Sequence, residues 1–320
     1  MGIRLLNRFI KDTCNESSNV YSFQALENKK IVIDIYNYIY RFLANNRLLE
    51  ELDIFCKILH KHNIRALFVF DGKYGDEKKK EQEKRREQRK NAIELYDKLN
   101  EQYENKIKTK KVKRKLNMLK REKVKLSKWD IVDVKKYLDV AGMKYVVADG
   151  EAEELCCELV NKNKVFACMS EDTDLFALGC KRIIKAIHFK REEFYMYSLN
   201  NILNNLNMDI NVFRMICTLS CNDYSNDNSN KHFIYFMNLY NKFLETNNDQ
   251  YKDFVNWLEQ KKYIFENEKQ NYFTNQNIFD ISNKNLISHL KFISLHNGIY
   301  NKRKINAIMI DRKMYLNGDM

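Results

Sequence analysis

The stretch Val165-Phe-Ala-Cys-Met-Ser-Glu-Asp-Thr-Asp174 sets a short apolar run directly before three acidic residues. Residues 165–169 have the length and the apolar character of a buried β-strand. The acids that follow, Glu171, Asp172 and Asp174, would then stand at the carboxyl end of that strand. Ligands of open α/β sheets gather at this end of the strands. The stretch therefore predicts a sheet that carries acidic side chains at its ligand-binding edge.

Other short runs rich in β-branched and aromatic residues alternate with segments of helical periodicity over the first two thirds of the chain. Together with residues 165–169, the predicted strands are 30–35, 66–70, 145–148 and 183–189. The predicted helices are 48–62, 127–138, 202–206, 212–219, 233–244 and 254–259. Ser127 is a good N-cap for the second helix, and Gly142 has the chemistry of a helix C-terminus. Strands that alternate with helices indicate an α/β fold with a mostly parallel central sheet and flanking helices.

Nearly all the excess positive charge lies in one segment. Between Asp76 and Lys128 the chain carries 21 Lys or Arg against 10 Asp or Glu, which is +11 of the net charge of +13. The segment has no glycine or proline and a thin apolar stripe, so a helical, mostly solvated insertion is predicted. Such a run is usually a solvated face. Its position directly after an acidic strand end favours an insertion that attracts nucleic acid.

The other predicted strands also lead to acidic residues. The first ends in Asp34, the second in Asp71, and the third is followed by Glu151 and Glu153. A further acid, Asp223, comes after a predicted helix in the next part of the chain. Each acid alone has a structural explanation, because aspartates cap helices or occupy turns and glutamates favour helix N-termini. The repetition at successive strand ends favours a shared site.

Converging carboxylates repel each other unless cations compensate them or protons neutralise some of them. Hard divalent ions prefer oxygen ligands, and Mg²⁺ keeps several waters while it binds few carboxylates directly. A large acidic cluster therefore fits two Mg²⁺ ions held partly through water, which Mn²⁺ can replace. Two such ions roughly 3.5–4 Å apart activate a water and stabilise the leaving oxygen of a phosphodiester. The acids thus predict metal-assisted phosphate hydrolysis.

At these positions the chain resembles the flap endonuclease and XPG-type family of structure-specific 5′ nucleases. The motifs that carry the resemblance follow in family order: Met1-Gly2-Ile3, Ile31-Val-Ile-Asp34, Tyr40, Phe70-Asp71-Gly72-Lys73, Glu151-Ala-Glu153, Ser170-Glu-Asp-Thr-Asp174 and Asp223-Tyr224. The resemblance implies a PIN-like nuclease core whose two-metal catalytic site is formed by seven acids: Asp34, Asp71, Glu151, Glu153, Asp172, Asp174 and Asp223. It also implies that the amine of Gly2 lies near this site once Met1 is removed.

By the same resemblance, the basic insertion looks like the family's helical arch, through or beneath which the 5′ single strand passes. Lys78 and Arg85 match arch positions that reach toward the scissile phosphate, where positive charge would stabilise the transition state. DNA contacts are expected from Gly2, Tyr40, Arg47, Lys78, Lys84, Arg85 and Arg89. Tyr40 is expected at a strand-to-helix junction, either stacked on an unpaired base or as a half-buried core tyrosine. Arg47 is expected to contact the template strand.

After Asp223 the chain departs from the family pattern. A glycine-rich turn whose amides hold duplex phosphates around a potassium ion is replaced by Ser225-Asn-Asp-Asn-Ser-Asn230. Residues 1–224 are therefore predicted to be the nuclease core, with the arch inserted at about 74–128. Residues 225–320 are predicted to be a helical C-terminal region with a degenerate helix-turn-helix duplex-binding element. The Gln-led aromatic motif for the sliding clamp is not visible, so no clamp interaction is expected.

The eight cysteines stand mostly in apolar contexts without paired Cys-x-x-Cys spacing, which indicates neither a zinc site nor a disulfide framework. No apolar run is long enough to span a bilayer, and no signal peptide is apparent. These features predict an intracellular monomer in a reducing compartment, the nucleus or the cytoplasm. Its expected partner is branched or 5′-ended DNA, not a membrane.

The sequence leaves three functions open. The favoured one is a flap endonuclease and 5′–3′ exonuclease for DNA replication, repair or recombination. An RNA-directed endonuclease of the same superfamily would use the same metal site. A catalytically silent nucleic-acid-binding scaffold would keep the fold, but buried carboxylates that bind no metal are costly to retain.

Overall fold

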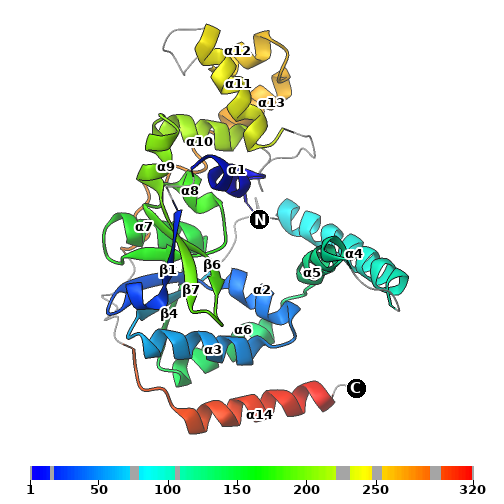
Figure 1. The fold of residues 1–320 in the computed structure, drawn as a ribbon, viewed down its shortest axis with the longest axis vertical. Coiled ribbons are helices and arrows are strands. Elements are labelled where there is room, and N and C mark those ends of the chain that lie inside the picture. The colour runs from blue at the N-terminus through cyan, green and yellow to red at the C-terminus, as the bar shows by residue number, and fades with distance from the viewer. Residues whose placement is uncertain are drawn as a thin grey trace. The chain divides into compact units, whose positions relative to one another are not determined.

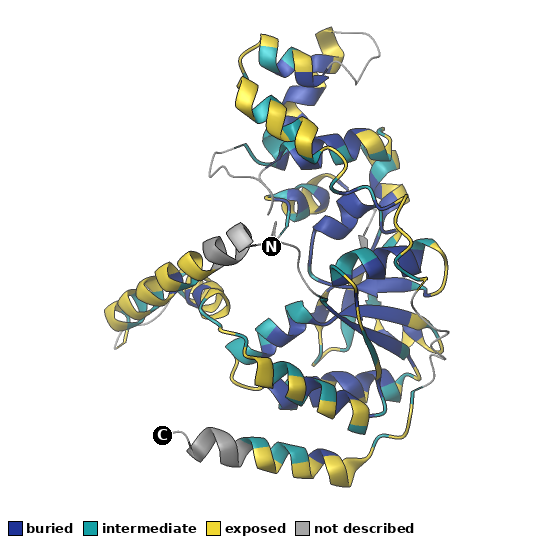
Figure 2. Ribbon diagram, turned by 180° about the vertical axis from the view of Figure 1, so that it is seen from behind, coloured by how far each residue is buried: buried dark blue, intermediate teal, exposed yellow. Residues whose placement is uncertain are grey.

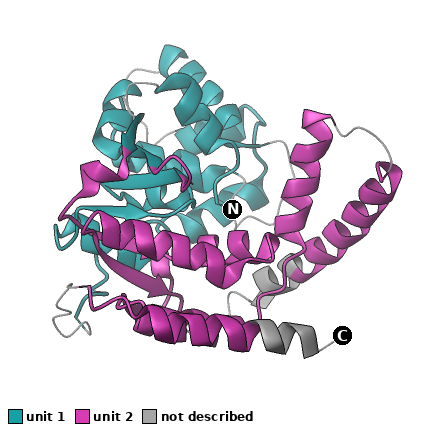
Figure 3. Cartoon of the chain, turned by 60° about the horizontal axis from the view of Figure 1, so that its bottom comes forward, with its two compact units in different colours: residues 1–21, 153–187, 193–291 teal, residues 22–152, 188–192, 292–320 magenta. Residues whose placement is uncertain are grey.

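The structure is a computed structural model that describes residues 2–14, 18–72, 79–104, 109–220, 231–246, 254–288 and 297–318. The chain divides into two compact units, each built from separate parts of the sequence (Figure 3). Unit 1 comprises Met1–Tyr21, Glu153–Ile187 and Glu193–Lys291. Unit 2 comprises Ser22–Ala152, His188–Glu192 and Phe292–Met320.

Unit 2 contains three parallel strands with helices around them (Figure 1). Its elements, in chain order, are the 3₁₀ helix η2 (Phe23–Leu26), β2 (Lys30–Asp34), α2 (Tyr36–Ala44), α3 (Leu48–Lys61), β3 (Arg65–Phe70), α4 (Lys79–Gln102), α5 (Lys110–Glu122), α6 (Lys128–Val140), β4 (Lys144–Val147) and α14 (Lys302–Gly318). The strands lie in the order β2-β3-β4. In register, Asp34 is level with Val69, and Phe70 is level with Val147.

Unit 1 contains the remaining strands, in the order β1-β7-β6-β5. Its elements are α1 (Leu6–Thr13), β1 (Ser18–Ser22), α7 (Ala152–Asn161), β5 (Ala167–Met169), α8 (Asp174–Leu178), β6 (Arg182–His188), β7 (Glu193–Ser198), α9 (Leu199–Asn205), α10 (Ile210–Leu219), α11 (Phe233–Thr246), α12 (Phe254–Gln260) and α13 (Glu266–Asn275). β5 and β6 are parallel. A four-residue connection joins β6 to β7, and a connection this short fits only an antiparallel pair.

The α/β class and the mostly parallel strands expected from the sequence are confirmed. Ile31, Val32 and Ile33 of β2 are fully buried, because a parallel strand is covered on both faces and needs a continuous apolar run. Figure 2 shows the strands mainly in the colour of buried residues. One strand is shorter than expected: β5 begins at Ala167, since residues 162–166 form the turn that follows α7.

The ends of α6 follow the expected chemistry. Ser127 and Asp130 form a reciprocal capping box, in which the Asp130 amide donates to Ser127 Oγ (3.1 Å) and the Ser127 amide donates to Asp130 Oδ2 (2.9 Å). Beyond the helix, Gly142 has a φ of 71°. A Cβ at Gly142 would lie 2.5 Å from the backbone of Gly298, whose amide donates to the Gly142 carbonyl (2.6 Å). Only glycine allows these two backbones to approach so closely.

The basic segment forms two helices, α4 and α5, that pack on each other through a narrow apolar contact. Ala92, Leu116 and Leu119 are buried, whereas most of the surrounding residues with described side chains are exposed. Lys123 places its ammonium 3.8 Å from the ring centroid of Tyr96. The thin apolar stripe predicted for this segment is therefore present.

A buried carboxylate joins three parts of unit 2. Asp53 of α3 accepts hydrogen bonds from the hydroxyls of Tyr137 (2.7 Å) and Tyr300 and pairs with Lys57 (2.6 Å). Burial alone would raise the pKa of Asp53, but the hydrogen bonds from Lys57, Tyr300 and Tyr137 hold this pKa below its ordinary value. The ionised carboxylate therefore stabilises the packing of α3 against α6 and the segment that precedes α14.

No helix among the described residues is long and apolar enough to cross a membrane. Seven cysteines lie in the described part of the chain; all of them are buried, and none of them forms a disulfide.

Candidate metal centre

Unit 2 brings Asp34, Asp71 and Glu151 to the same edge of its parallel strands. Asp34 is the last residue of β2, Asp71 directly follows β3, and Glu151 follows β4 after a short loop. The loops after β3 and β4 are tied together, because the Ala152 amide donates to Asp71 Oδ1 (2.9 Å) and the Gly72 amide donates to the Gly150 carbonyl (2.8 Å). Parallel pairing thus places the acids at the edge expected from the sequence.

Asp34 is oriented by the first turn of α2. It is 6% exposed, and its carboxylate accepts from the Tyr36 amide (3.3 Å) and from Asn37 Nδ2 (3.0 Å). The half-buried Tyr36 packs edge-on against Phe70, with the ring centroids 6.1 Å apart. Burial and the nearby carboxylates of Asp71 and Asp34 raise the pKa of Tyr36 to about 12. Its neutral hydroxyl therefore belongs to the environment of these acids.

Unit 1 holds a second acidic pair in the turn after β5. Asp172 and Asp174 are 9% and 3% exposed. The Asp174 amide donates to Asp172 Oδ1 (3.1 Å), and the Asp172 amide donates to Ser170 Oγ (3.1 Å). Glu153 also belongs to unit 1 and lies in the first turn of α7, where the helix dipole favours a negative charge. The turn thus holds both aspartates at fixed positions.

A buried lysine donates hydrogen bonds to the backbone of this turn. Lys185 of β6 donates to the carbonyls of Glu171 and Asp172 (2.7 Å each), and the Ala186 amide donates to Glu171 Oε1 (2.8 Å). Burial lowers the pKa of Lys185, although the negative charges of Glu171, Asp172 and Asp174 favour its ammonium form. The lysine therefore fixes the backbone of the turn while its charge offsets part of the acidic cluster.

Gly2 lies against the same turn. Its φ is 85°, and a Cβ added to it would lie 2.4 Å from Thr173 Oγ1, 2.5 Å from Asp172 Oδ1 and 2.6 Å from Asp174 Oδ1. The next residue is also anchored there, since the Ile3 amide donates to Thr173 Oγ1 (2.9 Å). Only a residue without a side chain fits so close to the two carboxylates.

The structure corrects the expected position of Tyr40. This residue is half-buried in the interior of α2 and not at the strand-to-helix junction, which Tyr36 occupies instead. The reason is that α2 begins two residues after Asp34, so Tyr40 comes more than one turn later. Arg47 is exposed and stands at the N-cap of α3, where it is accessible to a partner.

Four of the predicted site residues have side chains outside the described part of the chain. Lys78 and Asp223 lie outside the described residues, and so does the turn 225–230. Lys84 and Arg85 lie on α4, but their side chains are also outside the described part. Arg89, one turn further along α4, has a half-buried side chain.

The donors in each unit suit a hard divalent ion. All are carboxylates, and Mg²⁺ in proteins is commonly bound through one or two carboxylates with the remaining positions filled by water. Within the described residues, no group of three or more His, Cys, Asp or Glu side chains converges on one point that could hold a metal. Asp172 Oδ1 and Asp174 Oδ1 lie 2.5 Å and 2.6 Å from the position that a Cβ on Gly2 would take, so these two carboxylate oxygens are close to each other.

Three residues near the acids were not predicted from the sequence: Tyr36, Lys185 and Arg214. Each had a signal in the sequence, because Tyr36 comes two residues after Asp34, and Lys185 and Arg214 each interrupt an otherwise apolar run. Lys185 stands inside the strand Ile183-Ile-Lys-Ala-Ile187, and Arg214 stands inside the helix Val212-Phe-Arg-Met-Ile216. A charged residue in such a run is costly unless it is paired.

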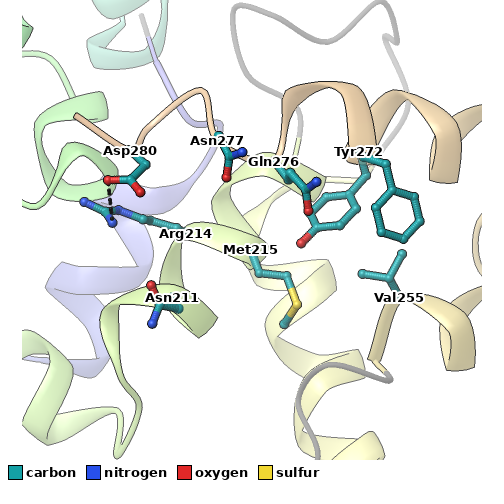
Figure 4. Close-up of a pocket in the computed structure, with 9 residues that line it drawn as sticks. Asn211, Arg214, Met215, Val255, Tyr272, Gln276, Asn277 and Asp280 are labelled. Carbon is teal, nitrogen blue, oxygen red and sulfur yellow. Dashed lines mark hydrogen bonds and ion pairs between the residues drawn. The ribbon is translucent and has the colours of Figure 1, made fainter. Parts of the chain in front are cut away.

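Arg214 links the acidic turn to a pocket in unit 1 (Figure 4). Its Nε and Nη2 donate to the carbonyls of Ala177 (2.9 Å) and Leu178 (3.1 Å), at the end of the short helix α8 that begins with Asp174. Its Nη1 lies 3.5 Å from Asp280 Oδ1, and both residues line the pocket. The pocket has a volume of about 340 Å³. Arg214 thereby fixes the C-terminal end of the helix whose first residue is a predicted metal ligand.

Comparison with known families gives two matches along the chain. The XPG N-terminal domain matches residues 1–92, and the XPG I-region matches residues 142–223. These two regions contain all seven predicted acids. They are separated by much of the basic segment.

Among curated proteins, the chain is similar to Flap endonuclease 1 of Eremothecium gossypii, with 28% identity over 207 residues, 59% of this chain and 51% of the relative. It is also similar to Flap endonuclease 1 of Xenopus tropicalis, with 27% identity over 244 residues, 70% of this chain and 61% of the relative. The chain thus spans about half to three fifths of the length of these relatives.

Among solved structures, the fold is similar to the catalytic core of Rad2 in complex with a DNA substrate, with a TM-score of 0.66 and 19% identity over 96% of this chain and 94% of the other. It is also similar to flap endonuclease-1 from Methanococcus jannaschii, with a TM-score of 0.60 and 21% identity over 92% of this chain and 90% of the other. At these identities the likeness establishes the fold.

Proposed function

Because the chain belongs to the family of XPG-type nucleases, we propose that it is a structure-specific 5′ nuclease that hydrolyses phosphodiesters at junctions of single- and double-stranded DNA. This proposal includes flap endonuclease and 5′–3′ exonuclease activity in replication, repair or recombination. The observation that carries it is the repeated placement of acids directly after parallel strands, Asp34 and Asp71 in one unit and Asp172 and Asp174 in the other.

We propose further that the chain's acids hold two Mg²⁺ ions, which Mn²⁺ can replace. The proposed ligands are Asp34, Asp71, Glu151, Glu153, Asp172, Asp174 and Asp223. When bound, such ions supply an activated water and stabilise the leaving oxygen. The chain's own contribution is orientation: Asn37 holds the carboxylate of Asp34, and Lys185 fixes the backbone that carries Asp172. Carboxylates that are held in place lose little freedom when an ion binds.

The basic helices α4 and α5 are proposed to guide the 5′ strand. Their lysines and arginines attract phosphates, and this attraction weakens as salt rises. Lys78→Ala and Arg85→Ala are expected to slow single-turnover cleavage more than they weaken duplex binding, because charge near the scissile phosphate stabilises the transition state. Quenched-flow cleavage and fluorescence anisotropy separate these effects. Rates near wild type for both variants would refute the arch assignment.

Other DNA contacts are proposed from the remaining matched positions, which are Gly2, Tyr40, Arg47, Lys84 and Arg89. The corresponding domain proposal is a nuclease core of residues 1–224 and a helical duplex-binding region of residues 225–320. A panel of flap, nicked, blunt and single-stranded DNA, with RNA counterparts, tests the substrate class. Preferential cleavage of the RNA set would favour the RNA-directed endonuclease instead.

The decisive experiment changes one proposed ligand at a time, two in unit 1 and one in unit 2. Asp172→Asn, Asp174→Asn and Asp71→Asn are each expected to abolish cleavage of a labelled flap in Mg²⁺ while DNA binding is largely retained, since the basic surface is unchanged. Lys284→Gln serves as a control for loss of a charge in an exposed ion pair of unit 1. Substantial turnover by the Asn variants would disprove the site. Wild-type protein that binds but never cleaves would indicate a silent scaffold.

A further inference from the structure

The N-terminal half of α6, the helix that follows the basic helices in the chain, exposes apolar side chains. Trp129 is 70% exposed and Val132 is 37% exposed, and together with Lys136 they follow an i, i+3, i+7 spacing that places them on one side of the helix. A tryptophan is seldom so accessible, because its large apolar ring gains much by burial. α6 follows α5 after a short connection and belongs to the same unit.

The charge around this face is positive. Two acids of α6, Asp130 and Asp133, are engaged by Arg312 of α14, with Asp130 Oδ1 at 2.7 Å. The lysines around the tryptophan, Lys125, Lys128 and Lys136, are exposed. Within the described part of the chain none of these three lysines forms an ion pair. Because Asp130 and Asp133 pair with Arg312, they do not pair with these lysines, which stay available to an anion.

An exposed aromatic ring among lysines matches the chemistry of single-stranded nucleic acid. Every base offers a flat face that stacks on an aromatic side chain, and the phosphates on either side attract ammonium groups. A protein partner fits less well, because lysine is depleted from the core of protein interfaces. Duplex DNA fits less well too, since its bases are already stacked on each other.

We infer that Trp129 stacks on an unpaired base of single-stranded nucleic acid, with Lys125, Lys128 and Lys136 at the neighbouring phosphates. This inference rests on the proposed function and adds a base-stacking site to it, apart from Tyr40. The strand is held at the start of α6 by a residue whose contact is indifferent to base identity. The site therefore supports binding of any unpaired strand without selecting its sequence.

Intrinsic fluorescence tests this contact directly. The chain has two tryptophans, and Trp257 packs within the aromatic cluster of Phe243, Phe254 and Tyr263. In Trp257→Phe, Trp129 is the only tryptophan, and its emission should be quenched on titration with unlabelled oligo-dT in EDTA. The quenching should saturate together with the anisotropy of a labelled strand. Binding by anisotropy with unchanged Trp129 emission would overturn the inference.

Substitutions separate stacking from folding. Trp129→Ala should raise the Kd for oligo-dT roughly five- to hundred-fold, whereas Trp129→Tyr should retain most of the affinity. Tyr195→Ala is the matched control, because Tyr195 is also an exposed aromatic residue (37%) but lies on β7 of unit 1; its Kd should stay at the wild-type value. Equal losses in Trp129→Ala and Tyr195→Ala would refute a specific stack. If oligo-dT does not bind but the flap is cleaved in Mg²⁺, the stacking inference alone fails; if neither occurs, the proposed function fails as well.

Discussion

Replacing Gly2 by alanine should disturb the acidic turn of unit 1 without unfolding the protein. A left-handed φ of 85° costs an L-residue roughly 1–2 kcal/mol. The new methyl group would also lie 2.4–2.6 Å from Thr173 Oγ1, Asp172 Oδ1 and Asp174 Oδ1. Real Cβ contacts are essentially never below 3.0 Å, so all three oxygens, or the segment that carries Gly2, must move.

The expected loss of activity exceeds the loss of stability. Displacing a catalytic group by about 1 Å can reduce a rate on the order of a hundred-fold, so a ten- to hundred-fold slower single-turnover cleavage is expected for Gly2→Ala. The same variant should lose about 1–2 kcal/mol of unfolding free energy, with the remaining steric cost relieved by movement of the carboxylates. The rate of flap cleavage in saturating Mg²⁺ and urea denaturation measure the two quantities.

Two other glycines provide controls. Gly179 has nearly the same φ, 88°, but its Cβ would meet only the flexible end of Arg214 at 3.2 Å. Gly179→Ala should therefore show a similar loss of stability and a smaller loss of rate. At Gly150 nothing lies within 4 Å of an added Cβ, so Gly150→Ala should change little. Intact mass confirms that all variants share one N-terminus, and a wild-type rate in Gly2→Ala would refute the argument.

Three further outcomes are expected. Because the pKa of Asp53 is lowered by folding, its ionised carboxylate contributes to stability above the ordinary pKa near 3.8, and this contribution is lost as pH falls through the lower pKa of the folded state. The unfolding free energy of Asp53→Asn should therefore change less between pH 6 and pH 3 than that of wild type. Equal changes in the two proteins would contradict this. Arg214→Ala leaves the carbonyls of Ala177 and Leu178 and the carboxylate of Asp280 without this partner, so the variant should lose about 1–3 kcal/mol of unfolding free energy. It should also require more Mg²⁺ for half-maximal cleavage, with partial recovery in Arg214→Lys. A thermal melt and an Mg²⁺ titration that match wild type would show that Arg214 does not support the end of α8. Because the segment 225–230 has no glycine and carries Asp227, flap cleavage at equal ionic strength should proceed equally in potassium and sodium chloride, and a clear preference for potassium would show a retained ion site.

The elements that could be predicted from the sequence are those in which burial imposes a recognisable pattern of apolar residues. The continuous apolar runs of β2 and β3 have few alternatives to a parallel strand buried on both faces. β7 was not predicted as a strand, because its buried residues, Phe194 and Tyr197, are three positions apart and do not follow the alternation of a half-buried strand. α13 has no buried residue, so it lacks the apolar periodicity that marks a helix, and α2 is rich in tyrosines that also favour strands.

The positions of Asp34 and Asp71 were predictable because each stands where a strand ends, which is a local property of the sequence. The residues that hold them in place depend on tertiary contacts. Lys185 lies 13 residues from Asp172, and Thr173 meets Ile3 across 170 residues, so no sequence spacing connects either pair. Tyr40 was assigned from resemblance, and its place depends on the residue at which α2 begins.

The carboxylate of Asp53 also bears on how the chain is made. Its partner Tyr137 follows 84 residues later, but Tyr300 follows only after 247 residues. At a synthesis rate of about 5–20 residues per second, roughly 10–50 s pass between the synthesis of Asp53 and that of its second tyrosine partner. During that time the whole of Glu193–Lys291, which belongs to unit 1, is produced. The buried hydrogen-bond network of unit 2 is therefore completed only after the intervening segment of unit 1 has been synthesised.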